Sequence, residues 1–182
     1  VQAIYAAEFD KVLPFIHKKT LVCGITQSGE TADLLEAFAS AKKQGSAVIS
    51  IINARGSSAE RESSFSIPVN AGPERAVAST KAATAQCATI TLLAYARAGK
   101  QAYGEKKLKE ASHSIKKWLT DDLLSRISTI AEKIKHNEDL YVIGKSVNYP
   151  IALEAALKIK EVSYIHAEGF AAGELKHGTL AL

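Results

Sequence analysis

Short apolar runs alternate with helix-forming segments in the first part of the chain, and this alternation limits the possible folds more than any other feature. The runs Thr20–Thr26 (TLVCGIT) and Ala47–Ile52 (AVISII) are almost wholly apolar, which predicts strands buried on both faces of a parallel sheet. A third strand is expected at Phe65–Val69. Helices are expected between the strands, at Thr31–Gln44 and Ala59–Glu62. This order predicts an α/β fold with a doubly wound parallel sheet.

The rest of the chain is more helical and then returns to the strand pattern. A helix is expected from about Ser79 to Ala98, with Ser79 or Thr80 as its N-cap, and residues 100–137 are lysine-rich and amphipathic, which is typical of a helical connector. The run Asp139–Gly144 (DLYVIG) predicts a new strand, and we expect the chain to end after this strand and one helix. The predicted division is the C-terminal part of a first domain at 1–99, a connector at 100–137 and the N-terminal part of a second domain at 138–182.

Composition excludes several classes of protein. The chain has 182 residues, of which 47% are hydrophobic and 23% charged, as in soluble globular proteins. Its net charge of +4 comes from basic and acidic residues in mixed order, so no nucleic-acid partner is expected. No stretch approaches the ~20 apolar residues of a membrane-spanning helix, and no signal peptide is visible, which favours a cytoplasmic protein without a membrane partner.

Two further details of the composition lead to expectations. Cys23 and Cys87 each lie inside an apolar run and are expected to be buried thiols in a reducing compartment. The chain starts at Val1 and contains no Met. We therefore expect a fragment of a longer polypeptide, or a sequence from which modified methionines are missing.

Hydroxyl and amide side chains gather between the first expected strand and its helix, at Thr26, Gln27, Ser28 and Thr31. A loop at this place offers backbone N–H groups and the positive end of the helix dipole to an anion, and Gly29 lets the backbone approach a phosphate closely. A helix cap alone would need one hydroxyl. Because neither a Walker lysine nor a GxGxxG pattern is present, a sugar phosphate fits better than a nucleotide.

Charged residues also share one face of the last expected helix. Glu154, Lys158 and Glu161 are separated by four and three residues. Surface salt bridges are the common explanation for such spacing. However, the helix is otherwise strongly apolar, so a carboxylate beside an ammonium there is a candidate base. His166 and His177 have carboxylates nearby, but they lack the spacing of metal ligands, which favours a catalytic or capping role.

Three longer motifs occur in order along the chain: ITQSGETADLLEA, AGPERAVASTKAATAQ and NYPIALEAALKIKEVSYIHAEGFAAGELKHGTLAL. Together they resemble the isomerase region of the glutamine:fructose-6-phosphate aminotransferase (isomerizing) family, which is built from two sugar isomerase (SIS) domains. The resemblance covers almost the whole chain. It implies a three-layer αβα sandwich with a parallel, flavodoxin-like sheet, in two SIS units that are both incomplete in this chain.

The resemblance also implies roles for individual residues. Substrate-binding positions of the family match Thr26, Gln27, Ser28 and Thr31 for the phosphate, and Val77 and Ser79 for the sugar. Catalytic positions match Glu161 as the base that moves a proton between C1 and C2 of the sugar, Lys158 as its lysine neighbour, Glu154 in a supporting place, and His177 for ring opening. Thr179 replaces the usual Pro, and Gly144-Lys145-Ser146 replaces the usual Gly-Arg-Gly.

The implied activity is the conversion of fructose 6-phosphate to glucosamine 6-phosphate with glutamine-derived ammonia, a step of hexosamine biosynthesis. It needs no metal and no cofactor. The family pattern adds a glutaminase domain in the full-length protein, a C-terminal lysine for a Schiff base, and a homodimer in which His177 comes from the neighbouring subunit. Two alternatives remain: an SIS-type glucosamine-6-phosphate deaminase or deglycase, and a non-catalytic SIS sensor that binds a sugar phosphate. A sensor has no need of Glu161, Lys158 and His177.

Overall fold

The structure is a computed structural model that describes residues 1–179. The chain divides into two compact units, Val1–Glu110 (unit 1) and Ala111–Leu182 (unit 2). The division between Glu110 and Ala111 falls inside a helix and does not coincide with either predicted boundary, after residue 99 or after residue 137. The three-part domain division therefore remains a prediction.

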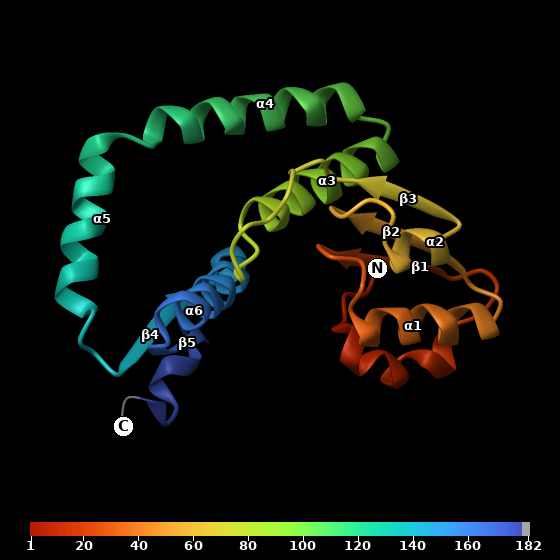
Figure 1. The fold of residues 1–182 in the computed structure, drawn as a ribbon, viewed down its shortest axis with the longest axis horizontal. Coiled ribbons are helices and arrows are strands. Elements are labelled where there is room, and N and C mark those ends of the chain that lie inside the picture. The colour runs from red at the N-terminus through yellow and green to blue at the C-terminus, as the bar shows by residue number, and fades with distance from the viewer. Residues whose placement is uncertain (180–182) are drawn as a thin grey trace. The chain divides into compact units, whose positions relative to one another are not determined.

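Unit 1 contains a parallel sheet with the strand order β1 (Leu21–Thr26), β2 (Ala47–Ile52) and β3 (Phe65–Pro68). The connections are α1 (Ala32–Lys43) and α2 (Ser58–Glu62). Figure 1 shows α1 lying along one side of this sheet. Each element lies within one residue of its predicted bounds, so the α/β prediction is confirmed here.

One face of the sheet is closed by α1. Phe38 of α1 is fully buried and lies so close to Gly24 of β1 that any side chain at position 24 would collide with the ring. Val48 of β2 and Phe9 belong to the same apolar cluster. Phe9 comes from the short helix η1 (Ala6–Lys11), which is followed by η2 (Leu13–Phe15). Glycine at position 24 is thus what lets the helix approach the strand.

The other face of the sheet is largely open within the described part of unit 1, so the prediction of strands buried on both faces is wrong for β1. Leu21, Cys23 and Ile25 point away from α1 and are exposed, whereas Ile51 of β2 is buried. Cys23 and Cys87 are both exposed, which corrects the prediction of buried thiols. Cys23 is exposed because it lies on the open face, and Cys87 because it lies on an uncovered side of its helix.

Two helices joined by a turn follow the sheet, and a third helix comes after them. α3 (Lys81–Arg97) and α4 (Gln101–Trp118) turn at Gly99, whose φ of +69° is the left-handed conformation expected after a helix. The rings of Tyr95 and Tyr103 meet edge to face, with centroids 5.5 Å apart. This contact joins the two helices close to the turn.

The predicted connector at residues 100–137 consists of two helices. α5 (Asp121–Ile134) follows a break after α4. Thr120 is its N-cap, and the Thr120 Oγ1 accepts a hydrogen bond from the N–H of Leu123 at 3.3 Å. The periodicity of the segment does not reveal this break, because the apolar positions keep helical spacing on both sides of it.

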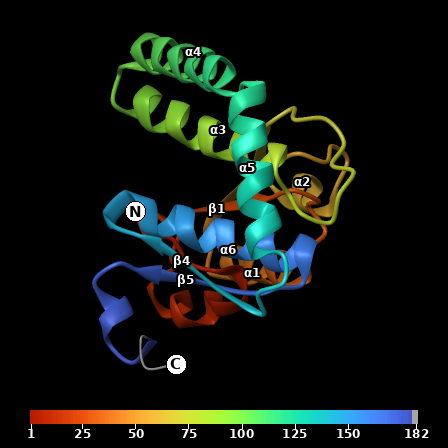
Figure 2. The ribbon, with the colours of Figure 1, turned by 90° about the vertical axis from the view of Figure 1, so that its left-hand side faces the viewer.

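Unit 2 contains a strand, helix and strand: β4 (Asp139–Gly144), α6 (Tyr149–Ser163) and β5 (His166–Ala171). The two strands pair in parallel (Figure 2). The strand β5 is not predicted from the sequence, where the chain is expected to end after the helix. The segment HAEGFA combines Gly, Glu and His, which are not typical of strands, and it forms a strand by pairing with β4.

Small residues place α6 close to the two strands. Ala152 and Ala156 of α6 and Ala167 of β5 are buried, and a Cβ at Gly169 would lie 2.8 Å from the Cα of Leu153. Two short helices complete the unit, η3 (Ser146–Asn148) and η4 (Glu174–Lys176). Among the helices of residues 1–179, none combines the length and apolar character that a membrane span would need.

Candidate functional site

The loop between β1 and α1 carries the four predicted phosphate-binding residues Thr26, Gln27, Ser28 and Thr31. Thr26 is buried at the end of β1, and its Oγ1 accepts a hydrogen bond from the N–H of Gly29 at 3.1 Å. The Oγ of Ser28 accepts from the N–H of Glu30 at 3.2 Å. Thr31 occupies the N-cap position of α1 without a side-chain capping bond. The hydroxyl protons of Thr26 and Ser28 are therefore available for donation to a further acceptor.

The backbone of the loop also suits an anion. Gly29 has a φ of +71°, a conformation that costs little only for glycine. A side chain at position 29 would, in addition, collide with the side chain of Ser57. The loop leads directly into α1, whose first N–H groups have no partner within the helix. Together these features favour a site for a phosphate or carboxylate group.

A hollow of about 490 Å³ adjoins the loop at the carboxyl ends of the strands. Its polar lining follows all three strands: Gln27 after β1, Asn53 and Arg55 after β2, Asn70 and Gly72 after β3. Arg55 pairs with Glu60 across 3.0 Å, Nε to Oε1. The lining residues after β2 and β3 are not among the predicted site residues. They could have been found from their position, because ligands of parallel sheets bind at this edge.

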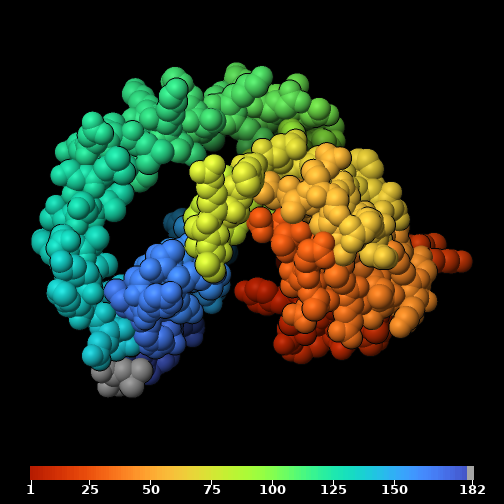
Figure 3. All heavy atoms as spheres, viewed as in Figure 1, coloured from red at the N-terminus to blue at the C-terminus, as the bar shows by residue number. Residues whose placement is uncertain are grey.

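Val77 and Ser79, predicted to line the sugar, lie in the segment between β3 and α3. This segment stands out from the body of unit 1 as the yellow chain in Figure 3, and Val77 is 94% exposed. Thr80 is the N-cap residue of α3, one of the two predicted positions, but its side chain makes no capping hydrogen bond. The carboxylate of Glu74 accepts the hydrogen bond from the N–H of Ala82 instead, at 3.2 Å. The Glu74 carboxylate thus accepts the backbone N–H bond that an N-cap side chain would otherwise accept.

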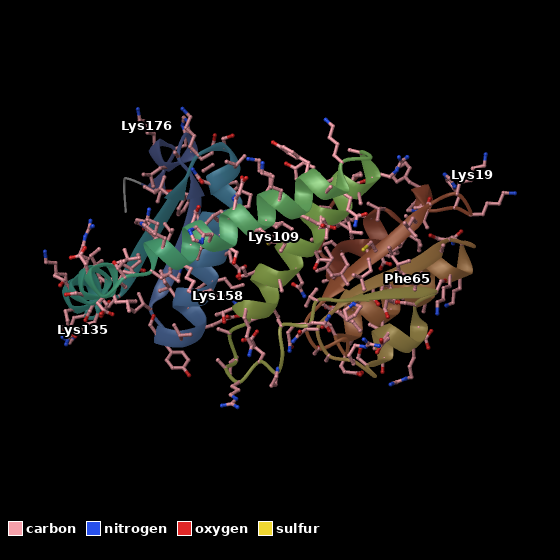
Figure 4. The ribbon with its side chains drawn as sticks, turned by 90° about the horizontal axis from the view of Figure 1, so that it is seen from above. Lys19, Phe65, Lys109, Lys135, Lys158 and Lys176 are labelled. Carbon is pink, nitrogen blue, oxygen red and sulfur yellow. The ribbon has the colours of Figure 1, made fainter. Side chains whose placement is uncertain are left out.

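The charged residues of α6 form a short chain of ion pairs, as their spacing predicts. The Nζ of Lys158 lies 2.6 Å from Oε2 of Glu161 and 3.6 Å from Oε1 of Glu154. Figure 4 labels Lys158 on α6. The side chains of Lys158 and Glu161 are only 23% and 28% exposed, and that of Glu154 is 50% exposed. Helical spacing places all three opposite the buried Ala152 and Ala156, so they face away from the strands.

The ion pairs determine the protonation state of Lys158. The hydrogen bond with Glu161 raises the pKa of Lys158 above its usual 10.5, and the charge of Glu154 adds to the effect. Lys158 is therefore an ammonium ion throughout the neutral range and cannot accept a proton. Its short contact instead holds the carboxylate of Glu161 in one orientation. The two carboxylates can take and return a proton, and that of Glu161 is the less exposed of the two.

The two histidines singled out in the sequence have different surroundings. His177 is exposed directly after η4, and its backbone N–H bonds to the carbonyl of Glu174 at 2.9 Å. His166 lies at the start of β5, with Nδ1 2.6 Å from Asp139 Oδ1 and Nε2 3.4 Å from Glu168 Oε1. Within residues 1–179, no three His, Cys, Asp or Glu side chains are arranged to hold a metal ion.

We expect His166 to make the stability of unit 2 depend on pH. The hydrogen bond with Asp139 raises the pKa of His166 above the usual 6.5. The folded protein binds this proton more tightly than the unfolded chain, so the stabilisation is complete below pH 6.5 and is lost as the pH rises through the raised pKa. Thermal unfolding of the wild type and of His166→Gln should give a melting-temperature difference that shrinks with rising pH. A difference that is constant between about pH 5 and 9 would contradict this.

The fold and the loop define a class of protein: a parallel α/β protein with a hydroxyl-rich anion loop at the carboxyl edge of its sheet. The family model described as "SIS domain" matches residues 1–96 and 133–182, and the chain belongs to this family. The predicted three-layer αβα fold is thereby confirmed.

Individual relatives are similar over most of this chain. Glutamine--fructose-6-phosphate aminotransferase [isomerizing] of Aquifex aeolicus is 41% identical over 181 residues, which cover 100% of this chain and 30% of the relative. The protein of the same name from Thermococcus kodakarensis is 44% identical, over 92% of this chain and 29% of its own length. The C-terminal domain of glucosamine-fructose-6-phosphate aminotransferase from Francisella tularensis superposes with a TM-score of 0.79 at 41% identity, covering 88% of this chain and 47% of that one. The chain thus spans about a third of the curated relatives it matches.

Proposed function

We propose that this chain is the central part of the isomerase half of a glutamine:fructose-6-phosphate aminotransferase. The observation that carries the proposal is the half-buried carboxylate of Glu161, held 2.6 Å from the ammonium of Lys158. A protein that only binds a sugar phosphate has no use for such a base. The names and the identity of the relatives from Aquifex and Thermococcus support the same activity.

The substrate of this reaction is fructose 6-phosphate, and the loop after β1 would bind its phosphate group. Thr26, Gln27, Ser28 and Thr31 would donate hydrogen bonds to the phosphate oxygens, and Gly29 would let the backbone approach them. Val77 and Ser79 would line the sugar. An uncharged set of donors is sufficient here, because the positive end of α1 already favours the anion.

The reaction converts a ketose phosphate into an amino aldose phosphate. The ring must open, an imine must form at C2, and a proton must move from C1 to C2. A single carboxylate can remove the proton from one carbon and return it to the next, which is the role proposed for Glu161. Lys158 would hold that carboxylate in place, Glu154 would support Lys158, and His177 of the neighbouring subunit would assist ring opening. None of these steps uses a metal or a redox cofactor.

The protein as a whole would be a cytoplasmic homodimer with a shared active site and a separate glutaminase domain as its source of ammonia. The division into SIS segments at 1–99 and 138–182 with a helical connector at 100–137 is part of the same proposal. Neither a nucleic acid nor a membrane is a proposed partner.

Product analysis of the complete polypeptide tests the proposal against its two alternatives. With fructose 6-phosphate and glutamine, the proposed enzyme forms glucosamine 6-phosphate and glutamate. A deaminase would release ammonia from glucosamine 6-phosphate and would not use glutamine. A sensor would bind either sugar phosphate without turnover, and either of these results would refute the proposal.

A further inference from the structure

The segment from Asn53 to Ala59, which leads from β2 into the first turn of α2, lies between two loops of the candidate site. We call it the bridge segment. On one side it holds the phosphate loop through three hydrogen bonds: Ala54 N–H to the Gln27 carbonyl at 3.0 Å, Ala59 N–H to the Gly29 carbonyl at 2.9 Å, and Ser58 N–H to the Glu30 carboxylate at 2.8 Å. Two of these bonds involve only the backbone, so side-chain changes leave them in place.

On its other side the bridge segment holds the loop after β3 through one side chain. The Nδ2 of Asn53 donates to the carbonyl of Gly72 at 2.8 Å, and its Oδ1 accepts from the N–H of Ala71 at 2.9 Å. Both ends of the amide are used. Asn70, which comes just before Ala71 and Gly72, has a φ of +54°. The chain therefore turns sharply next to the two residues that Asn53 binds.

We propose that Asn53 is a positioning residue for sugar-phosphate binding: through Ala71 and Gly72 it fixes the segment that leads to Val77 and Ser79 relative to the phosphate loop. This inference rests on the proposed function. Asn53 comes directly after the central strand β2, so one rigid element carries both attachments.

Asn53 should affect sugar binding because ordering the segment between β3 and α3 costs conformational entropy. The segment between β3 and α3 leaves Val77 94% exposed; Glu74 ties its later part to α3, and the Asn53 amide ties its beginning to β2. Without the Asn53 amide, binding of the sugar would have to order this segment and would lose affinity accordingly. The phosphate loop keeps its own hydrogen bonds to the bridge segment. Loss of Asn53 should therefore weaken binding of the sugar much more than binding of a bare phosphate.

The test uses the complete polypeptide with Asn53→Ala, and Ser46→Ala as the matched control. Ser46 precedes β2 at the opposite end of the same strand, and its Oγ donates to the Thr20 carbonyl at 2.8 Å. For each variant we would measure the KM and kcat for fructose 6-phosphate, the inhibition constant of inorganic phosphate and the melting temperature.

For Asn53→Ala we expect the KM to rise about tenfold, which corresponds to the loss of one to two hydrogen bonds. The kcat and the phosphate inhibition constant should stay within about threefold, since neither depends on the lost bonds. Ser46→Ala should lower the melting temperature and leave the KM unchanged. If Asn53→Ala does not fold, Asn53→Asp keeps the acceptor for Ala71, loses the donor to Gly72 and should shift the KM in the same direction.

Failure of this inference differs from failure of the proposed function. A wild-type protein that neither binds nor converts fructose 6-phosphate refutes the function. A wild-type protein that converts it, together with an Asn53 variant whose KM rises no more than that of Ser46→Ala, refutes the positioning role. A fall in kcat at constant KM, or an equal loss of phosphate affinity, would refute it as well.

Discussion

Glu161→Gln is expected to lower kcat for the formation of glucosamine 6-phosphate by about a hundredfold to ten-thousandfold, the range ascribed to a general base. Glutamine has the shape of glutamate and keeps an acceptor for Lys158, so α6 and its contacts should persist. An amide cannot accept the proton that must leave C1. The measurement is steady-state product formation from fructose 6-phosphate and glutamine by the complete polypeptide.

Glu154→Gln is the matched control for this experiment. Glu154 lies on the same face of α6 and also pairs with Lys158, but at 3.6 Å and with half of its side chain exposed. Its replacement should lower kcat by less than about tenfold, since an exposed ion pair contributes little. Equal losses in the two variants would mean that the charge of the group matters and that Glu161 is not the base. The glutaminase reaction, which needs no proton transfer on the sugar, should survive in both.

Gly29→Ala is expected to weaken sugar-phosphate binding by at least about a hundredfold. The change has two costs: a Cβ at a φ of +71°, and a collision with the side chain of Ser57. Because Gly29 also receives the hydrogen bond from Ala59 and donates to Thr26, the loop cannot move away without losing the hydrogen bonds that shape it. The dissociation constant of fructose 6-phosphate, measured calorimetrically, checks this.

Gly45→Ala separates backbone strain from damage to the site. Gly45 ends α1 with a φ of +76°, but a Cβ there would meet only Lys18, at an ordinary 3.6 Å. The Gly45→Ala variant should have a lower melting temperature, as expected also for Gly29→Ala, but an unchanged dissociation constant for fructose 6-phosphate. Adding Ser57→Gly to Gly29→Ala removes the collision and should recover part of the affinity. If Gly29→Ala binds as tightly as the wild type, the loop after β1 is not the phosphate site.

The features of the fold and the site that could be predicted are those set by residues close together in the sequence. The bounds of β1 follow from an apolar run and those of α1 from a helical period, and the pairing of Lys158 with Glu161 follows from helical spacing alone. Each of these depends on residues a few positions apart, so the sequence shows them directly.

The features that escaped prediction depend on contacts between distant segments. β5 exists because it pairs with β4 across an intervening helix, and the Asn53 side chain meets Ala71 only because β2 and β3 are neighbours. The exposure of Cys23 likewise depends on which face of the sheet is covered, and an apolar run does not specify that. Periodicity within one segment carries no information about such contacts.

Because α6 packs closely on Gly169, one side of the helix tolerates no larger side chains, whereas the exposed side does. On the side of Ala152 and Ala156 there is no space for an added methyl group without moving the helix, and with it the carboxylate of Glu161. Leu157 and Val162, exposed in unit 2, have room for other side chains. Libraries that aim to change the proposed sugar specificity should therefore vary these outer positions and keep the small inner residues, since an inner change would displace the proposed base, Glu161.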